Sequence, residues 1–243
     1  KMCSKGGVAM KVEVWSDYVC PFCYIGKKQL EKAIEDMGYK GQVEVEYKSY
    51  LLDPNTPVDT EETVYSELSK KYGMPIEKVK EMTKGVEERA AVVGLHYDFS
   101  KMKSANTLRA HRLAKWAETK GKGQEFTELV LKAYFLEYEP IGKQEVLLKI
   151  AEELGLDVKE AEEVINGDQF TQEVEQDIEQ AQSLGVRGVP FFVFENKYGI
   201  SGAQPQEIFE RTIKRVAEEK GLKPKLQMLG EDGANCIDGQ CNM

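Results

Sequence analysis

Two cysteines separated by two residues are the side chains in this sequence best suited to covalent chemistry. Cys20 and Cys23 enclose Pro21 and Phe22; an apolar alternating run, residues 12–19, leads into the pair, and a helix-like pattern follows it. This spacing allows the two sulfurs to meet across one helical turn, at a separation compatible with a disulfide. The pattern therefore predicts reversible dithiol–disulfide chemistry.

The position of Cys20 at the first turn of the predicted helix should favour its thiolate. A first turn leaves backbone N–H groups unpaired and carries the positive end of the helix dipole. A thiolate placed there is stabilised relative to the thiol, which lowers the thiol pKa. We expect Cys20 to be a nucleophile near neutral pH.

A predicted βαβ unit positions this pair. Residues 10–16 and 43–50 alternate with a period of two, and residues 26–37 carry apolar side chains at helical spacing. A helical crossover brings the second strand parallel to the first. Near the other end of the chain, residues 191–194 and 198–202 predict a β-hairpin that turns at 195–197.

The long segment between these strands is predicted to be almost entirely helical. Prolines in residues 53–57 interrupt regular structure, and Asp59 with Glu62 resembles a capping box that opens the first helix. Glycines and Pro140 mark the breaks between helices. The expected helices cover residues 59–72, 75–94, 106–120, 124–138, 143–154, 158–165 and 170–184, with a closing helix at 204–220.

This order of elements resembles the thioredoxin superfamily, and more closely the FrnE-like subgroup of the DsbA family. The resemblance rests on residues 16–27, 106–112 and 185–192 and extends from residue 10 to about residue 220. It implies an α/β thioredoxin fold with a large all-α insertion domain. The expected divisions are a leader or tag remnant (1–9), a thioredoxin-like domain (10–56 and 180–221), a helical insertion (57–179) and a C-terminal tail (222–243).

The resemblance also implies roles for individual residues. Cys20 corresponds to the exposed attacking thiol and Cys23 to the buried resolving thiol. Pro190 corresponds to the cis-proline opposite the redox pair, which would leave the backbone of Val189 free to pair with an extended substrate. These matches imply a thiol–disulfide oxidoreductase or isomerase acting on protein disulfides.

The dipeptide between the cysteines bears on the direction of the reaction. Pro21 and Phe22 support the site because groups between the cysteines determine how well the Cys20 thiolate is stabilised. The pair Pro-Phe differs from the corresponding dipeptides of thioredoxin and of DsbA. Oxidase, reductase and isomerase activity all remain open.

A second cysteine pair lies near the end of the chain, and a lone Cys3 near its start. Cys236 and Cys241 flank an Asp-Gly step that favours a tight turn. The pair could exchange electrons with Cys20 and Cys23, form a local disulfide, or remain reduced. We favour a second redox pair, because a flexible tail of about twenty residues has the reach to visit Cys20.

Two other functions compete with the redox interpretation. Glutathione-dependent isomerases and transferases, the kappa-class transferases and hydroxychromene carboxylate isomerases, share the inserted-domain architecture. They typically have serine at the first position, so Cys20 argues against this function. A zinc-binding module would use Cys20, Cys23, Cys236 and Cys241 as four ligands. The redox interpretation requires no metal and no cofactor.

The charge and hydropathy of the sequence limit the classes of partner that we expect. The net charge is −9, and the chain contains no basic run with interleaved aromatic residues, so nucleic acid is not an expected partner. Neither a secretory signal nor a long apolar window occurs, which predicts a cytoplasmic protein without a membrane partner. Expected partners are protein thiols and disulfides, with glutathione or a thioredoxin-type protein for recycling. His111 is interpreted as a packed or solvated side chain without a catalytic role.

Overall fold

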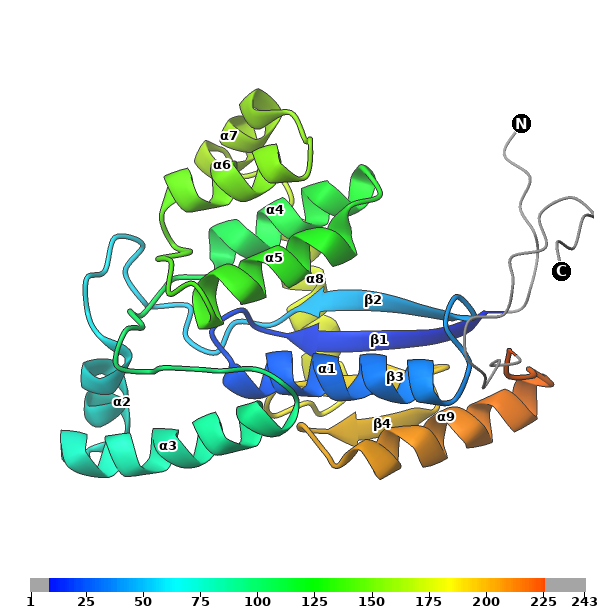
Figure 1. Ribbon diagram of the computed structural model, residues 1–243. Coiled ribbons are helices and arrows are strands. Elements are labelled where there is room, and N and C mark those ends of the chain that lie inside the picture. The colour runs from blue at the N-terminus through cyan, green and yellow to red at the C-terminus, as the bar shows by residue number, and fades with distance from the viewer. Residues whose placement is uncertain (1–8, 226–243) are drawn as a thin grey trace, which may run out of the picture.

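The computed structural model describes residues 9–225, which form a four-stranded mixed sheet with helices on both faces (Figure 1). The strand order is β2-β1-β3-β4. β1 and β2 are parallel, whereas β3 is antiparallel to both β1 and β4. The predicted βαβ unit and hairpin are therefore confirmed. The strands are β1 (Met10–Ser16), β2 (Val43–Ser49), β3 (Phe191–Phe194) and β4 (Tyr198–Ser201).

Nine helices occur in the described part of the chain, and seven of them lie between β2 and β3 in sequence. Among residues 9–225, none is both long and apolar enough to cross a bilayer. The helices are α1 (Pro21–Asp36), α2 (Val64–Tyr72), α3 (Ile76–Val92), α4 (Leu108–Thr119), α5 (Gly123–Phe135), α6 (Gln144–Glu153), α7 (Val158–Asn166), α8 (Thr171–Ser183) and α9 (Gln206–Lys220).

The alternation of β1 divides its side chains between two cores. Val12 and Val14 join the apolar layer beneath α1 and α9, where the rings of Phe192 and Phe209 meet edge to face at 4.9 Å. Trp15 points to the opposite face and packs with residues of α8 and β3. The period of two thus places successive residues of one strand on different faces. Figure 1 shows α1 and α9 side by side along one face of the sheet.

Helix α2 begins later than the sequence predicts. Its N-cap is Thr63, whose side-chain oxygen accepts the Ser66 N–H at 3.2 Å. Glu62 instead accepts the Ser66 hydroxyl, so the predicted capping box of Asp59 and Glu62 is wrong. An isolated bridge between Thr63 and Lys103 holds the preceding segment extended, which delays the first turn.

Side chains from three helices cover the outer edge of β2. Each satisfies one backbone group that an edge strand would otherwise leave to solvent or to another chain. These contacts also hold α4, α5 and α8 against the sheet. The pairs are Gln124 Nε2 with the Val45 carbonyl (2.7 Å), Lys115 Nζ with the Tyr47 carbonyl (3.3 Å), and Asp177 Oδ2 with the Ser49 N–H (2.8 Å).

The helical segment and the redox segment share one hydrophobic core. Tyr18, Tyr24 and Ile25, which flank the Cys-x-x-Cys motif, are almost fully buried among residues of α4 to α7. The Tyr24 ring lies 6.3 Å from Phe135 of α5. The first turn of α1 is therefore held between the sheet on one side and the inserted helices on the other.

Candidate active site

The two cysteines lie where β1 passes into α1. Cys20 is the N-cap of α1, with φ −87° and ψ 112°, and Pro21 occupies the first helical position, where its lack of an N–H is no loss. The Cys23 N–H donates to the Cys20 carbonyl at 3.0 Å, and the Cys20 N–H donates to the Asp17 carbonyl at 3.1 Å. Both side chains are free thiols.

Cys20 is more deeply buried than the resemblance implies. Its exposed fraction is 4%, close to the 2% of Cys23, so the expectation of an exposed attacking thiol is wrong. The reason is the segment that enters β3, which lies against the sulfur. Cys20 Sγ is 3.4 Å from the carbonyl oxygen of Val189 and donates a hydrogen bond to it.

The peptide bond between Val189 and Pro190 is cis. The Pro190 carbonyl accepts the Gly202 N–H at 2.8 Å, which ties this turn to the end of β4. On the other side, α1 approaches so closely that a Cβ on Gly26 would lie 3.1 Å from Pro190 Cγ and 2.9 Å from the ring of Phe192. Glycine at this position allows α1 to hold the cysteines against the 189–190 turn.

The surroundings of Cys23 favour the protonated thiol over the thiolate. Burial raises the pKa of the Cys23 thiol well above its ordinary value, and the neighbouring Cys20 adds to this effect. Hydrogen bonds from the Ser16 hydroxyl and the Asp17 N–H oppose it. Cys23 therefore needs a proton acceptor before it can act as a nucleophile.

A buried acid–base pair lies behind the redox turn. Asp17 Oδ1 is 3.2 Å from His111 Nε2, and both side chains are at most 5% exposed. Asp17 Oδ2 accepts the Leu52 N–H at 2.8 Å, and the Tyr18 ring lies 4.7 Å from the imidazole. The sequence pattern alone does not single out Asp17, and it favours a packed or solvated His111 without a catalytic role. The signal in the sequence is a carboxylate three residues before Cys20.

Helix α3 and the connection between α3 and α4 also hold the dipeptide between the cysteines. The Tyr97 hydroxyl donates to the Pro21 carbonyl at 3.1 Å. The guanidinium of Arg89 lies 4.8 Å from the centroid of the Phe22 ring and donates to the Ala203 carbonyl at 3.1 Å. Arg89 thus joins α3, the redox turn and the β4–α9 connection.

The remaining cysteines, Cys3, Cys236 and Cys241, lie outside the described residues. The proposed second redox pair and the four-cysteine zinc site therefore stay predictions. Within residues 9–225, no group of three or more histidine, cysteine, aspartate or glutamate side chains is arranged to hold a metal ion.

Solved structures with a similar fold include disulfide oxidoreductases. The probable DsbA oxidoreductase SCO1869 from Streptomyces coelicolor superposes with a TM-score of 0.80 at 32% identity, over 96% of this chain and 99% of its own. Two structures below 25% identity show the fold alone. They are 2-hydroxychromene-2-carboxylate isomerase (TM-score 0.67, 16% identity, 87% of this chain and 98% of its own) and the cytosolic disulfide reductase DsbM from Pseudomonas aeruginosa with GSH (0.60, 17%, 86% and 99%).

Sequence comparison points to the same family. The protein YwbO of Bacillus subtilis (strain 168) is 28% identical over 216 residues, which is 88% of this chain and 100% of the relative. The sequence pattern of the DSBA-like thioredoxin domain matches residues 11–214. The predicted α/β thioredoxin fold with a helical insertion is thereby confirmed, and the chain belongs to the DSBA-like thioredoxin domain family of thiol–disulfide oxidoreductases.

Proposed function

We propose that this chain exchanges disulfides with protein substrates through Cys20 and Cys23. The observation that carries the proposal is the placement of the Cys20 sulfur, at the N-terminus of α1, against the Val189 carbonyl at 3.4 Å. The Cys20 thiolate attacks a substrate disulfide, forming a mixed disulfide and releasing one substrate thiolate. The Cys23 thiolate then attacks Cys20, which releases the second substrate thiolate and leaves the Cys20–Cys23 disulfide.

An extended polypeptide is the substrate shape that this site favours. The Val189 N–H makes no hydrogen bond with another described residue, and the Val189 carbonyl is held only by the Cys20 thiol. The N–H can therefore pair with a substrate backbone directly, and the carbonyl becomes available once Cys20 has reacted. A substrate strand laid along Val189 would place its own sulfur beside Cys20.

The proposal also covers the molecule that recycles the cysteine pair and the location of the protein. Glutathione is a candidate recycling thiol, since the structurally similar DsbM was solved with GSH. A thioredoxin-type protein, or the Cys236–Cys241 pair, could recharge the site instead. A cytoplasmic location, the FrnE-like subgroup and the division of the chain at residues 57 and 179 remain predictions from the sequence.

Cysteine-to-serine variants test the proposal. In insulin reduction and in refolding of a scrambled disulfide protein, Cys20→Ser should lose activity, whereas Cys23→Ser should accumulate mixed disulfides that gel electrophoresis without reductant detects. Cys3→Ser is the matched control, because it removes a cysteine outside the motif, and should retain full activity. Full activity of Cys20→Ser would contradict the proposal.

The wild type and the Cys20→Ser variant also distinguish disulfide exchange from the alternative function, that of a glutathione-dependent isomerase. The similarity to 2-hydroxychromene-2-carboxylate isomerase concerns the fold alone. Saturable binding of glutathione to Cys20→Ser, combined with absence of disulfide exchange in the wild type, would favour that alternative.

A further inference from the structure

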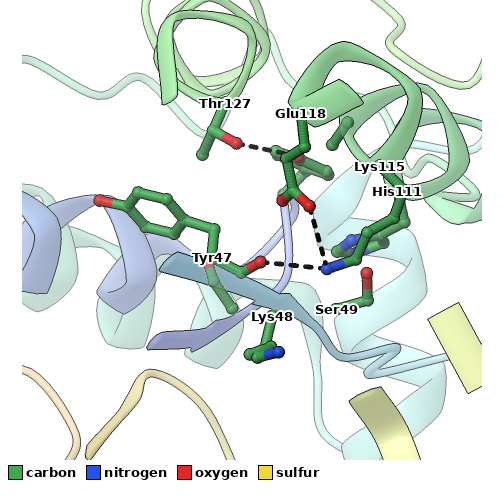
Figure 2. Close-up of a pocket in the computed structure, with 10 residues that line it drawn as sticks. Tyr47, Lys48, Ser49, His111, Lys115, Glu118 and Thr127 are labelled. Atoms are coloured by element: carbon green, nitrogen blue, oxygen red, sulfur yellow. Dashed lines mark hydrogen bonds and ion pairs between the residues drawn. The ribbon is translucent and has the colours of Figure 1, made fainter. Parts of the chain in front are cut away.

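A small cavity lies beneath the redox turn, between the end of β1, β2 and helices α4 and α5. Its volume is about 10 Å³, which is room for about one water molecule. Figure 2 shows the side chains around it, with His111, Lys115 and Glu118 projecting from α4 toward β2. We call this space, lined by Ser16, Tyr18, His111, Lys115, Glu118 and Thr127 among others, the Ser16 cavity.

Ser16 connects this cavity to the resolving cysteine. Its hydroxyl lies close enough to the Cys23 sulfur to lower the pKa of that thiol, and the same residue lines the cavity. A hydroxyl both donates and accepts hydrogen bonds, so it can pass a proton from one neighbour to another. The buried sulfur, which is 2% exposed, thus has a polar path away from the surface that Cys20 faces.

His111 lines the Ser16 cavity and is oriented by a carboxylate. Asp17 Oδ1 lies 3.2 Å from Nε2, and the Leu52 N–H fixes the other oxygen of Asp17 at 2.8 Å. A proton on Nε2 that faces Asp17 leaves Nδ1 as the nitrogen able to accept another. This is the arrangement in which an aspartate sets the tautomer of a histidine base.

We propose that His111, oriented by Asp17, accepts the proton of Cys23 through Ser16 and one water in the Ser16 cavity. This inference rests on the proposed function, because it concerns the second step of that reaction. Cys23 loses its proton to this path, and its thiolate forms a bond to Cys20. The bond from Cys20 to the substrate sulfur breaks, and the substrate leaves as a thiolate. The cysteine pair thereby loses two electrons and becomes a disulfide, and the substrate gains the same two electrons.

Other charged groups face the Ser16 cavity and bear on the choice of base. Lys115 of α4 is engaged in ion pairs, since its Nζ lies 2.6 Å from Asp177 of α8 and 3.6 Å from Glu118. Burial raises the pKa of Glu118, while Lys115 opposes this effect and Asp177 adds to it. Glu118 is therefore the competing base. Glu46 and Lys48 of β2 complete the charges on the sheet side.

Stopped-flow reaction with Ellman's reagent separates the two steps. The full chain is used with Cys3, Cys236 and Cys241 replaced by serine. Attack by Cys20 releases a first thionitrobenzoate, and attack by Cys23 on the mixed disulfide releases a second. In His111→Gln the second phase should slow at least ~10-fold at neutral pH. The first phase should stay unchanged.

Two further variants complete the test. Glu118→Gln is the matched control, because it removes a titratable group from the same cavity, and should leave both phases unchanged. Ser16→Ala keeps the Asp17–His111 pair and should slow the second phase alone, which tests the path even where His111→Gln fails to fold.

The outcomes separate this inference from the proposed function. A second phase in His111→Gln or Ser16→Ala with the wild-type rate would overturn the inference. A second phase slowed in Glu118→Gln as much as is expected for His111→Gln would overturn it as well, since Glu118 would then be the base. Absence of the first phase in the wild type would contradict the proposed function itself.

Discussion

The sulfur of Cys20 and the carbonyl oxygen of Val189 lie 3.4 Å apart, although the two residues are separated by 169 positions in the chain. Cys20 comes from the turn between β1 and α1, and Val189 from the segment before β3. The antiparallel pairing of β1 with β3 brings these segments together at one end of the sheet. The relationship makes the 189–190 turn one wall of the site.

The close approach of α1 to that wall predicts the effect of a single methyl group. Gly26→Ala would place a Cβ 2.9 Å from the Phe192 ring and 3.1 Å from Pro190. We expect a loss of about 1 to 3 kcal/mol in the free energy of unfolding, together with reduced disulfide exchange. Urea denaturation and insulin reduction measure the two effects. Gly85→Ala in α3, whose Cβ meets no atom within 4 Å, should be neutral or stabilising and is the matched control.

The contact between α4, α8 and the edge of β2 predicts a large stability effect. Asp177 lies 2.6 Å from Lys115 Nζ and accepts the Ser49 N–H at 2.8 Å, with both charged side chains less than 10% exposed. Asp177→Ala would leave the buried Lys115 cation with only the more distant Glu118 carboxylate, 3.6 Å away, and would remove the acceptor of the buried Ser49 N–H. We expect a loss of about 3 to 5 kcal/mol in chemical denaturation.

An exposed ion pair provides the comparison for Asp177. Asp36 pairs with Lys32 on the solvent face of α1. Asp36→Ala should leave the free energy of unfolding close to that of the wild type, because solvent screens such pairs. Equal losses for Asp177→Ala and Asp36→Ala would show that the buried cluster makes no special contribution.

Glu128 predicts an acid-dependent contribution to stability. Burial raises the pKa of this carboxyl, but Lys27, Lys28 and Tyr24 of α1 outweigh it and lower the pKa to about 2. Because the folded-state pKa lies below the unfolded value, the stabilisation is present above about pH 5 and is lost as the pH falls toward 2. Glu128→Gln should cost about 1 to 2 kcal/mol at pH 7, and this difference should shrink on acidification. A difference that is constant from pH 7 to pH 3 would contradict the assignment.

The surroundings of Cys23 predict slow alkylation. In Cys20→Ser, burial alone still raises the pKa of Cys23, so iodoacetamide should modify it at least ~10-fold more slowly at pH 7 than in the unfolded chain. Mass spectrometry of samples in which Cys3, Cys236 and Cys241 are replaced by serine measures this rate. Alkylation as fast as in urea would show that Cys23 is neither buried nor raised in pKa.

Local patterns were sufficient to predict most of the elements. The alternation of residues 10–16 and 43–50, and the apolar spacing of the helices, predict structures that packing preserves. The start of α2 was predicted wrongly because Thr63, which bridges to Lys103, caps the helix in place of Asp59. A bridge between distant segments leaves no trace in local spacing.

The cysteine motif was visible in the sequence, but its surroundings were not. The pairing of Asp17 with His111 joins residues 94 positions apart and depends on how α4 docks beside β1. The burial of Cys20 likewise depends on the 189–190 turn. Periodicity tells which face of an element is apolar, but tertiary docking determines which polar groups meet.

The shared core around Tyr18, Tyr24 and Ile25 has a consequence for local unfolding. These side chains are at most 4% exposed, and they pack with α4 and α5 rather than with the sheet. The redox turn should therefore open together with the inserted helices, as one cooperative unit. Amide protons at the start of α1 would then exchange at the pace of α4 and α5, while those of β1 exchange more slowly. The stability of the inserted helices therefore determines how often the two thiols become exposed to solvent.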